Sequence, residues 1–374
     1  MRRASHRRWQ RDDAQSSGRH ENGAVYTFLG VIGEILLTMA AICALYVAWQ
    51  LWWTGVQSEQ MQERTRQSAS WSAPASSASG GVNIASPQKG SAPVQPVSAT
   101  TGEFMAEVYI PRFGDSWSRN LVQGTALAQL NMHGFGHYVN SQMPGQIGNF
   151  AIAAHRNGYG QSLGDIDKLR KGDAIIIRTK DYWYVYTYTS HEIVLPTDVR
   201  VIASNPQDPT AKATKRLITM TSCEPKYSYA THRWIAYGKL KYWAKVSDGI
   251  PQELASTDSS GTVTFTAESA DSTALISLPS LDRIIMMMLV VYAVLFVAAA
   301  VAWGWPALSS TKRRRGGTGM YGWLLRIQPG AVPIRVLLVL VLLMAFAAAL
   351  FEWTFPWAAS TIPYLRSMSN YVTV

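Results

Sequence analysis

Cysteine is almost absent from this chain, whose 374 residues include only Cys43 and Cys223. Cys43 lies inside a long apolar run, whereas Cys223 lies in a more polar region, so the two thiols are not expected to meet. This arrangement excludes an internal framework of disulfide bonds. A single thiol outside the apolar runs is then either a buried structural residue or a nucleophile, and its neighbours in the sequence must decide between them.

Motifs for phosphate, dinucleotide and metal binding are also missing. No glycine-rich phosphate loop or dinucleotide fingerprint occurs in the sequence. His133 and His137 are four residues apart, but Gly134 and Gly136 stand between them and disfavour a helix. We interpret this histidine pair as a surface or structural feature. The sequence therefore predicts neither a metal site nor a cofactor.

Hydrophobic residues make up 48% of the chain, and they are unevenly spread. Three runs, residues 26–53, 284–305 and 332–353, are long enough to cross a bilayer. The first run is too long for the apolar part of a cleavable signal peptide, and no clear small-residue cleavage site follows it. We therefore expect an uncleaved anchor followed by two further membrane spans.

Charge predicts the orientation of these spans. The first 25 residues contain six arginines, and the segment 306–331 contains five basic residues and no acidic one. The positive-inside rule places both segments in the cytoplasm, which leaves residues 54–283 and the C-terminal tail outside. The net charge of +10 is then mostly a consequence of membrane topology. No nucleic-acid partner is expected.

Composition divides the chain into successive regions. The short strand-like runs after residue 104 predict a mainly β domain, whereas the Ser-, Ala- and Pro-rich stretch before it is typical of disorder. The expected regions are a basic cytoplasmic N-terminus (1–25), a transmembrane anchor (26–53), a disordered extracellular stalk (54–103), a β-barrel domain (104–246), a linker (247–283), a transmembrane helix (284–305), a basic cytoplasmic loop (306–331), a second such helix (332–353) and an extracellular tail (354–374).

The chemistry is expected where Cys223 ends a strand. The apolar run before it is strand-like, and Glu224-Pro225 interrupts that strand directly after the thiol. Arg233 opens the next strand-like run, and His155 ends an earlier one. A histidine supplies the ion pair or the proton transfer that makes a thiol a nucleophile, and an arginine stabilises the oxyanion of an acyl transfer. Together these residue types indicate thiol acyl transfer.

Three motifs carry a resemblance to a known family. The sequence TMTSC at 219–223 resembles the TLxTC signature of sortases, AIAAHR at 151–156 is similar to the family's histidine strand, and HRWIAYGKL at 232–240 is similar to its arginine strand. The resemblance runs from about Glu107 to Val246. It implies an eight-stranded β-barrel and a cysteine transpeptidase that cuts a cell-wall sorting motif between Thr and Gly.

The resemblance also implies roles for single residues. Cys223 attacks the threonyl carbonyl, His155 protonates the leaving amine and deprotonates the incoming one, and Arg233 holds the substrate backbone and the oxyanion. The residues expected to bind substrate are Thr221, Ser222 and Ala154. His191 and His232 are rival candidates for the base, and His155 is preferred because it matches the family position.

The subclass, substrate and reaction leave alternatives open. The segment from AIAAHR to TSCEPKYS resembles class E sortases of actinobacteria, whereas the two C-terminal spans resemble pilus-building class C. The expected substrates are secreted proteins with a C-terminal sorting signal of LPxTG or LAxTG type, and the acceptor amine belongs to a peptidoglycan precursor or a pilin lysine. The alternatives are an external cysteine peptidase that hydrolyses the thioester and a non-enzymatic membrane scaffold with a degenerate barrel.

Overall fold

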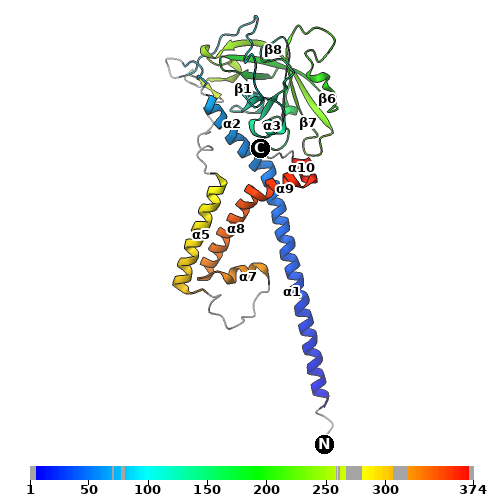
Figure 1. Ribbon diagram of the computed structural model, residues 1–374, viewed down its shortest axis with the longest axis vertical. Coiled ribbons are helices and arrows are strands. Elements are labelled where there is room, and N and C mark those ends of the chain that lie inside the picture. Colours follow the sequence, from blue (N-terminus) through cyan, green and yellow to red (C-terminus); the bar gives the residue numbers. More distant parts are fainter. Residues whose placement is uncertain are drawn as a thin grey trace. The chain divides into compact units, whose positions relative to one another are not determined.

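A computed structural model describes residues 6–69, 71–76, 81–257, 259, 262–266, 280–305 and 319–369. The chain divides into two compact units, and Figure 1 shows the helices and strands of each. One unit comprises residues 1–48 and 279–355 and contains the long apolar helices. The other comprises residues 49–278 and 356–374 and contains the β-sheet.

A closed eight-stranded barrel forms the centre of the second unit, as the sequence predicts. Its strands follow the order β1-β2-β3-β4-β7-β8-β6-β5 around the barrel. Their bounds are β1 Phe104–Tyr109, β2 Ser118–Gln123, β3 Phe135–His137, β4 Gly148–Ala154, β5 Ala174–Arg178, β6 Tyr182–Val194, β7 Arg216–Glu224 and β8 His232–Lys245. Closure pairs every strand on both sides, so the barrel presents no open sheet edge.

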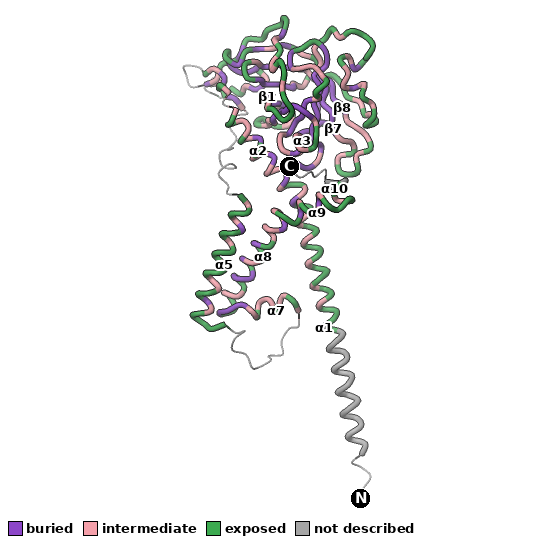
Figure 2. The backbone as a smooth tube through the Cα atoms, in the orientation of Figure 1, coloured by how far each residue is buried: buried purple, intermediate pink, exposed green. Residues whose placement is uncertain are grey.

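Alternating side chains fill the barrel. Along β7, Ile218 and Met220 belong to the central hydrophobic cluster, whereas their neighbours Thr219 and Thr221 point to the other face. Tyr184 and Tyr186 of β6 also belong to this cluster, so aromatic side chains help to fill the barrel. Figure 2 shows that burial is concentrated in these strands.

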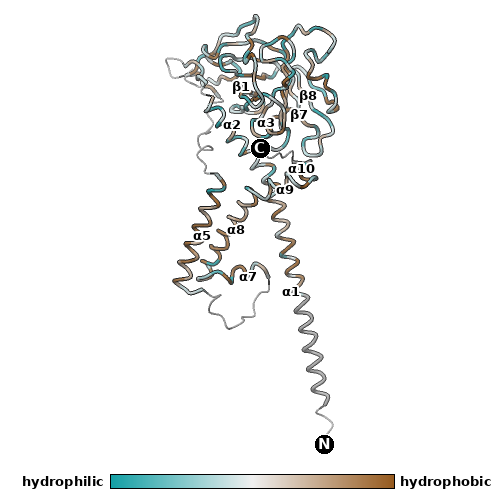
Figure 3. Tube along the Cα trace, in the orientation of Figure 1, coloured by the Kyte–Doolittle hydropathy of each residue, from teal (hydrophilic) through white to brown (hydrophobic). Residues whose placement is uncertain are grey.

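The first unit contains three long apolar helices and one short helix. The long helices are α1 (His6–Ala48), α5 (Leu281–Trp303) and α8 (Val332–Ala349), and the short helix is α7 (Met320–Ile327). Three candidate spans lie within Phe28–Ala69, Leu281–Trp303 and Val332–Thr361, in agreement with the three predicted runs. Figure 3 shows the hydrophobic colouring of α5, α8 and the described part of α1. Two short helices, α9 (Phe355–Thr361) and α10 (Pro363–Ser369), follow them.

The expectation of a disordered stalk over residues 54–103 is wrong for most of that segment. Helix α2 covers Thr54–Ala69, after the π-helical residues Trp49–Trp53. Residues 82–103 lie against the barrel unit, where Ala85 N donates to Ile250 O at 2.8 Å and Gln88 N donates to Trp243 O at 2.8 Å. The segment's composition cannot form a core of its own, but the barrel unit supplies the surface and the hydrogen-bond partners that order it.

The expected linker 247–283 is also partly ordered. A two-stranded sheet pairs β9 (Ala255–Thr257) with β10 (Val263–Phe265). Ile250, Leu254 and Phe265 are buried in a second hydrophobic cluster that includes Trp183 on the outside of the barrel. Apolar residues widely spaced in a polar sequence thus find burial against the sheet, which composition alone did not reveal. Residues 267–279 of the expected linker lie outside the described residues.

Candidate active site

Three neighbouring strands bring the predicted catalytic residues to one end of the barrel. β4 and β7 run parallel, and their last registered pair is Ala153 with Thr221. His155 and Cys223 each lie two residues beyond that pair, so the chain brings them to the same level. The hydroxyl of Ser222 donates to the carbonyl oxygen of Ala154 at 2.8 Å, which continues the connection between the two strands toward His155 and Cys223.

Cys223 lies opposite Arg233 on two antiparallel strands. The register of β7 with β8 pairs these two residues directly. Opposite residues on antiparallel strands point to the same face of the sheet, with Cβ atoms about 4.5–5.5 Å apart. Both residues are half-buried, and Nη1 of Arg233 donates to the carbonyl oxygen of His232 at 3.1 Å. A thiol and a planar cation therefore share one face, as thiol acyl transfer requires.

His155 follows β4 directly and is held on two sides. Its Nε2 atom is 2.6 Å from Oδ1 of Asn131, which lies on helix α3 (Leu127–His133). The ring of Tyr159 lies 5.3 Å from the imidazole. Because the amide oxygen is an acceptor, Nε2 carries the proton in this arrangement, which leaves Nδ1 as the basic nitrogen. Burial lowers the pKa of His155 from 6.5 to about 4, so the imidazole is neutral at pH 7.

Arg156 is a residue of this site that the sequence reasoning missed. Only 5% of its surface is exposed, and its Nη1 atom donates to the carbonyl oxygen of Cys223 at 3.4 Å. The same guanidinium forms an ion pair with Glu224 and lies 4.9 Å from the ring centroid of Trp234. Arg156 therefore connects the end of the histidine strand to the end of the cysteine strand. An arginine directly after the candidate base in the sequence was the available signal.

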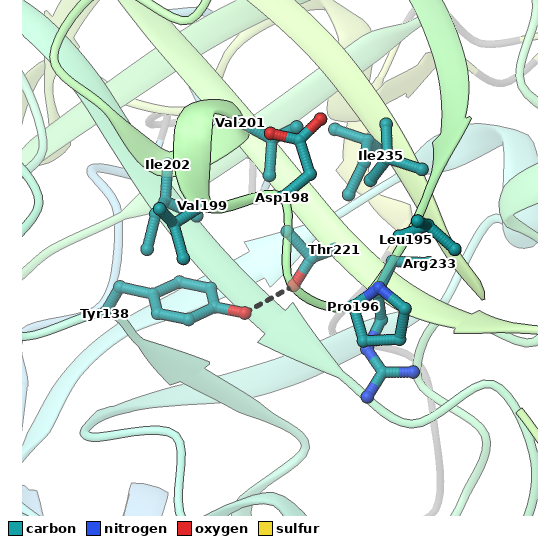
Figure 4. A pocket seen from close by; sticks show the side chains of 11 residues that line it. Tyr138, Leu195, Pro196, Asp198, Val199, Val201, Ile202, Thr221, Arg233 and Ile235 are labelled. Carbon is teal, nitrogen blue, oxygen red and sulfur yellow. Dashed lines mark hydrogen bonds between the residues drawn. The ribbon is translucent and has the colours of Figure 1, made fainter. Parts of the chain in front are cut away.

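A pocket opens on the face that carries Thr221 and Arg233. It has a volume of about 110 Å³, and its walls come mainly from Val194 to Ile202, together with Tyr138 and Ile235. Figure 4 shows that the Tyr138 hydroxyl points to the Thr221 hydroxyl, 3.0 Å away, while the Arg233 guanidinium lies to one side. The lining is mostly aliphatic, and a cavity of about 150 Å³ accepts benzene, so this pocket fits one aliphatic side chain. The sequence did not single out the segment 194–202.

The predicted substrate-binding residues are placed differently from one another. Thr221 lines the pocket. Ser222 is buried with its hydroxyl bonded to Ala154, and Ala154 belongs to the hydrophobic core of the barrel. The positions of Ser222 and Ala154 suit a structural role, whereas the position of Thr221 suits contact with a ligand.

The other histidines are engaged elsewhere. His191 stacks on Trp234, with ring centroids 4.7 Å apart, and Trp234 lies next to Arg233 in the strand and therefore on the opposite face of the sheet. His232 pairs in register with Glu224, and its Nδ1 atom lies 2.9 Å from the Thr231 hydroxyl. Neither histidine lies just beyond the end of β4 at the level of Cys223, as His155 does. His137 is fully buried and bonded to Gln123 at 2.6 Å, in line with a structural role for that residue.

Comparisons with known proteins agree with this fold. The sortase domain model matches residues 108–241. The sortase SrtE2 of Streptomyces coelicolor is 31% identical over 237 residues, which cover 60% of this chain and 88% of that protein. The sortase SrtE1 of the same organism is 29% identical and covers 63% of both chains. The solved SrtA sortase from Actinomyces oris is 36% identical, with a TM-score of 0.43, and the match covers 45% of this chain and 96% of that one.

The chain therefore belongs to the sortase family, whose members are cysteine transpeptidases. The two Streptomyces relatives carry E-type names, in agreement with the likeness to class E that the sequence motifs indicate. The range matched by the family model contains His155, Cys223 and Arg233.

Proposed function

We propose that this protein is a membrane-anchored sortase that cleaves an LPxTG- or LAxTG-like motif between Thr and Gly. The acyl group passes through a thioester on Cys223 to an amine, which attaches secreted proteins to the cell wall. The observation that carries this proposal is the placement of His155, Cys223 and Arg233 on the ends of three adjacent strands, β4, β7 and β8.

The geometry supports a division of roles among these residues. Cys223 is half-buried and attacks the threonyl carbonyl from the end of β7. Arg233 faces the same side and stabilises the oxyanion that develops on that carbonyl. His155 is neutral at pH 7, so it accepts the thiol proton and then donates it to the departing glycine amine. When the incoming amine attacks the thioester, His155 accepts a proton from that amine and returns it to the departing Cys223 thiolate, and the acyl group passes to the amine. We propose no cofactor for these steps.

The pocket beside Thr221 supports recognition of an aliphatic residue of the motif. Its wall contains Leu195, Val199 and Ile235, and the hydroxyls of Tyr138 and Thr221 lie together at one side; Asp198 and Arg233 supply its other polar groups. The first residue of both motif types is leucine, whose side chain suits an apolar pocket of about 110 Å³. Arg233 lies at the same pocket, so a peptide seated there would pass beside the thiol.

We also propose the membrane topology that the charges favour. Three apolar helices are long enough to span a bilayer. The arginine-rich N-terminus and the basic segment 306–331 would lie in the cytoplasm, and the barrel and the C-terminal tail would lie outside. The substrates of such an enzyme, which are secreted proteins and cell-wall or pilin amines, meet on that outer side.

Mass spectrometry of the acyl-enzyme tests the proposed function. The full chain in detergent is mixed with LPxTG and LAxTG peptides, with and without an added glycine-based amine. A mass increase equal to the peptide up to Thr, absent in Cys223→Ala and discharged by the amine, is the expected result. Discharge that is equally fast without amine would identify a hydrolase, and no adduct with either peptide would contradict the proposal. In a parallel reaction that offers a pilin domain in place of the glycine-based amine, a peptide product joined to a pilin lysine would favour the class C alternative.

A further inference from the structure

Helix α2 carries a row of polar residues that are buried. The exposed fraction is 1% for Thr54, 0% for Ser58 and 0% for Gln62. A spacing of four residues places the three on one face of the helix. Polar residues are buried where they find hydrogen-bond partners, so this face of α2 is fitted to a specific surface.

The C-terminal half of α2 packs on strand β2. Asn120 N donates to Oε1 of Gln62 at 2.9 Å, and Nδ2 of Asn120 donates to the Gln62 carbonyl oxygen at 2.8 Å. Nη1 of Arg66 donates to Oδ1 of Asn120 at 2.9 Å. Arg119 adds an ion pair with Glu59 at 3.3 Å. These bonds fix both the position and the register of α2 along β2.

The N-terminal half of α2 reaches the loop that follows His155. Tyr159 N donates to Oγ1 of Thr54 at 3.1 Å, and the ring of Tyr159 lies 5.3 Å from the imidazole of His155. A Cβ atom on Gly55 would stand 3.2 Å from the backbone nitrogen of Gly160, so helix and loop approach closely. The loop closes on itself, because Leu163 N donates to the His155 carbonyl oxygen at 2.9 Å.

Helix α2 also supports the second partner of His155. Asn131, which bonds the imidazole, belongs to α3, and α2 packs against α3 (Figure 1). A Cβ atom on Gly134, directly after α3, would stand 2.9 Å from Oε1 of Gln62. Both groups that hold His155 therefore rest on the same helix.

We propose that α2 positions His155 for catalysis, with Thr54 as a positioning residue that acts through Tyr159. The helix that follows the membrane anchor in the sequence is then part of the catalytic unit. This inference rests on the proposed function, in which His155 transfers the proton. A displacement of about 1 Å at a proton-transfer group is enough to slow a reaction strongly, so the effect belongs in kcat and not in substrate binding.

A matched pair of valine variants in the full chain tests the inference. Both threonine hydroxyls donate to the carbonyl oxygen four residues earlier, Thr54 to Gln50 at 2.8 Å and Thr65 to Met61 at 2.9 Å. Only Thr54 also accepts a bond from the loop. We expect Thr54→Val to lower kcat about tenfold with an unchanged KM for an LAxTG peptide, and Thr65→Val to leave both constants unchanged. Thr54→Ser, which keeps the hydroxyl, should restore kcat to within about twofold.

A second variant separates positioning from folding. Gly55→Ala favours the helix by up to about 1 kcal/mol, yet its methyl group crowds Gly160. A loss of kcat in this variant, with the thermal unfolding temperature unchanged or raised, is the expected result. Equal kcat values for Thr54→Val and Thr65→Val, or a fully active Gly55→Ala, would overturn the inference.

Hydrogen exchange of the full chain in nanodiscs gives a readout that does not need activity. Thr54→Val should speed amide exchange in the peptide that covers residues 158–163, and Thr65→Val should not. If the wild-type chain transfers no acyl group, the proposed function fails and the exchange comparison alone decides whether α2 holds the loop. Unchanged exchange in Thr54→Val would refute the contact even in an active enzyme.

Discussion

Cys223 and Arg233 are registered opposite each other on the antiparallel strands β7 and β8. The pairing places a thiol and a guanidinium side by side on one face, one strand end on each side of the connection 225–231. Because both positions belong to regular strands, their separation is set by backbone hydrogen bonds and not by flexible segments. The catalytic assignments that follow from this relationship can be tested one residue at a time.

Cys223→Ala should abolish acyl-enzyme formation and peptide transfer while the barrel stays folded. Replacing a half-buried thiol with a methyl group changes little volume and removes no ion pair. Cys43→Ala is the matched control, since it removes the other thiol and should leave transfer intact. Transfer that persists in Cys223→Ala would refute the nucleophile, and circular dichroism would show whether the barrel is intact.

Arg233→Lys should lower turnover by about 100-fold or more, which is the scale of losing one oxyanion donor. Lysine keeps the charge but loses the planar fork that can hold a backbone and an oxyanion together. His232→Ala, at the adjacent position on the other face of β8, should have a much smaller effect. Steady-state kinetics with one peptide decide the matter, and equal damage in the two variants would mean that Arg233 is the wrong neighbour of Cys223.

Arg156→Lys should reduce both stability and turnover. The guanidinium contacts the Cys223 carbonyl and Glu224 from a position that is 5% exposed, and a lysine cannot reproduce both contacts. Leaving buried partners unsatisfied costs about 1–3 kcal/mol. Arg112→Lys is the control, because Arg112 makes a two-pronged bond to Asp173 at 2.8 and 2.7 Å in an exposed position. Thermal unfolding and kcat should both fall in Arg156→Lys, and little change is expected in Arg112→Lys.

Stability should fall as pH is lowered from about 6.5 toward 4. Burial lowers the pKa of His155 and of His137 from 6.5 to about 4. In that window the unfolded chain binds protons that the folded chain does not, so the free energy of unfolding decreases as pH falls and is constant above it. The contribution is of the order of 3 kcal/mol for each histidine. Thermal unfolding of the full chain between pH 7.5 and pH 4.5 should show a flatter dependence in His155→Gln; an unchanged dependence would contradict the cause.

Thiol labelling of intact, wall-stripped cells tests the topology. In a Cys223→Ala background, an impermeant reagent should label a cysteine introduced at Ser259 and miss one at Ser310, which lies in the basic segment outside the described residues. Labelling at Ser310 would exclude the three-span arrangement. If the cysteine introduced at Ser259 is labelled only after lysis, the barrel lies on the side of the membrane away from secreted substrates.

The motifs around His155, Cys223 and Arg233 were enough to predict the family and the barrel, and the assignment of Cys223 as the nucleophile stays a prediction. Each motif combines a reactive residue with a strand-like run, and strand patterns survive in sequence because their burial alternates with a period of two. The expectation of a disordered stalk was wrong because Thr54, Ser58 and Gln62 are polar, and a prediction from composition places polar residues in solvent.

The sequence by itself determined which residues are candidates for the chemistry, which runs are apolar enough for a membrane and that a mainly β domain follows residue 104, because these are local properties of neighbouring residues. Only the tertiary structure decided that Arg156 joins the ends of β4 and β7, that residues 194–202 line the pocket and that α2 rests on the loop after His155. Those contacts join segments up to about a hundred residues apart, and their energy comes from paired groups that no local pattern records.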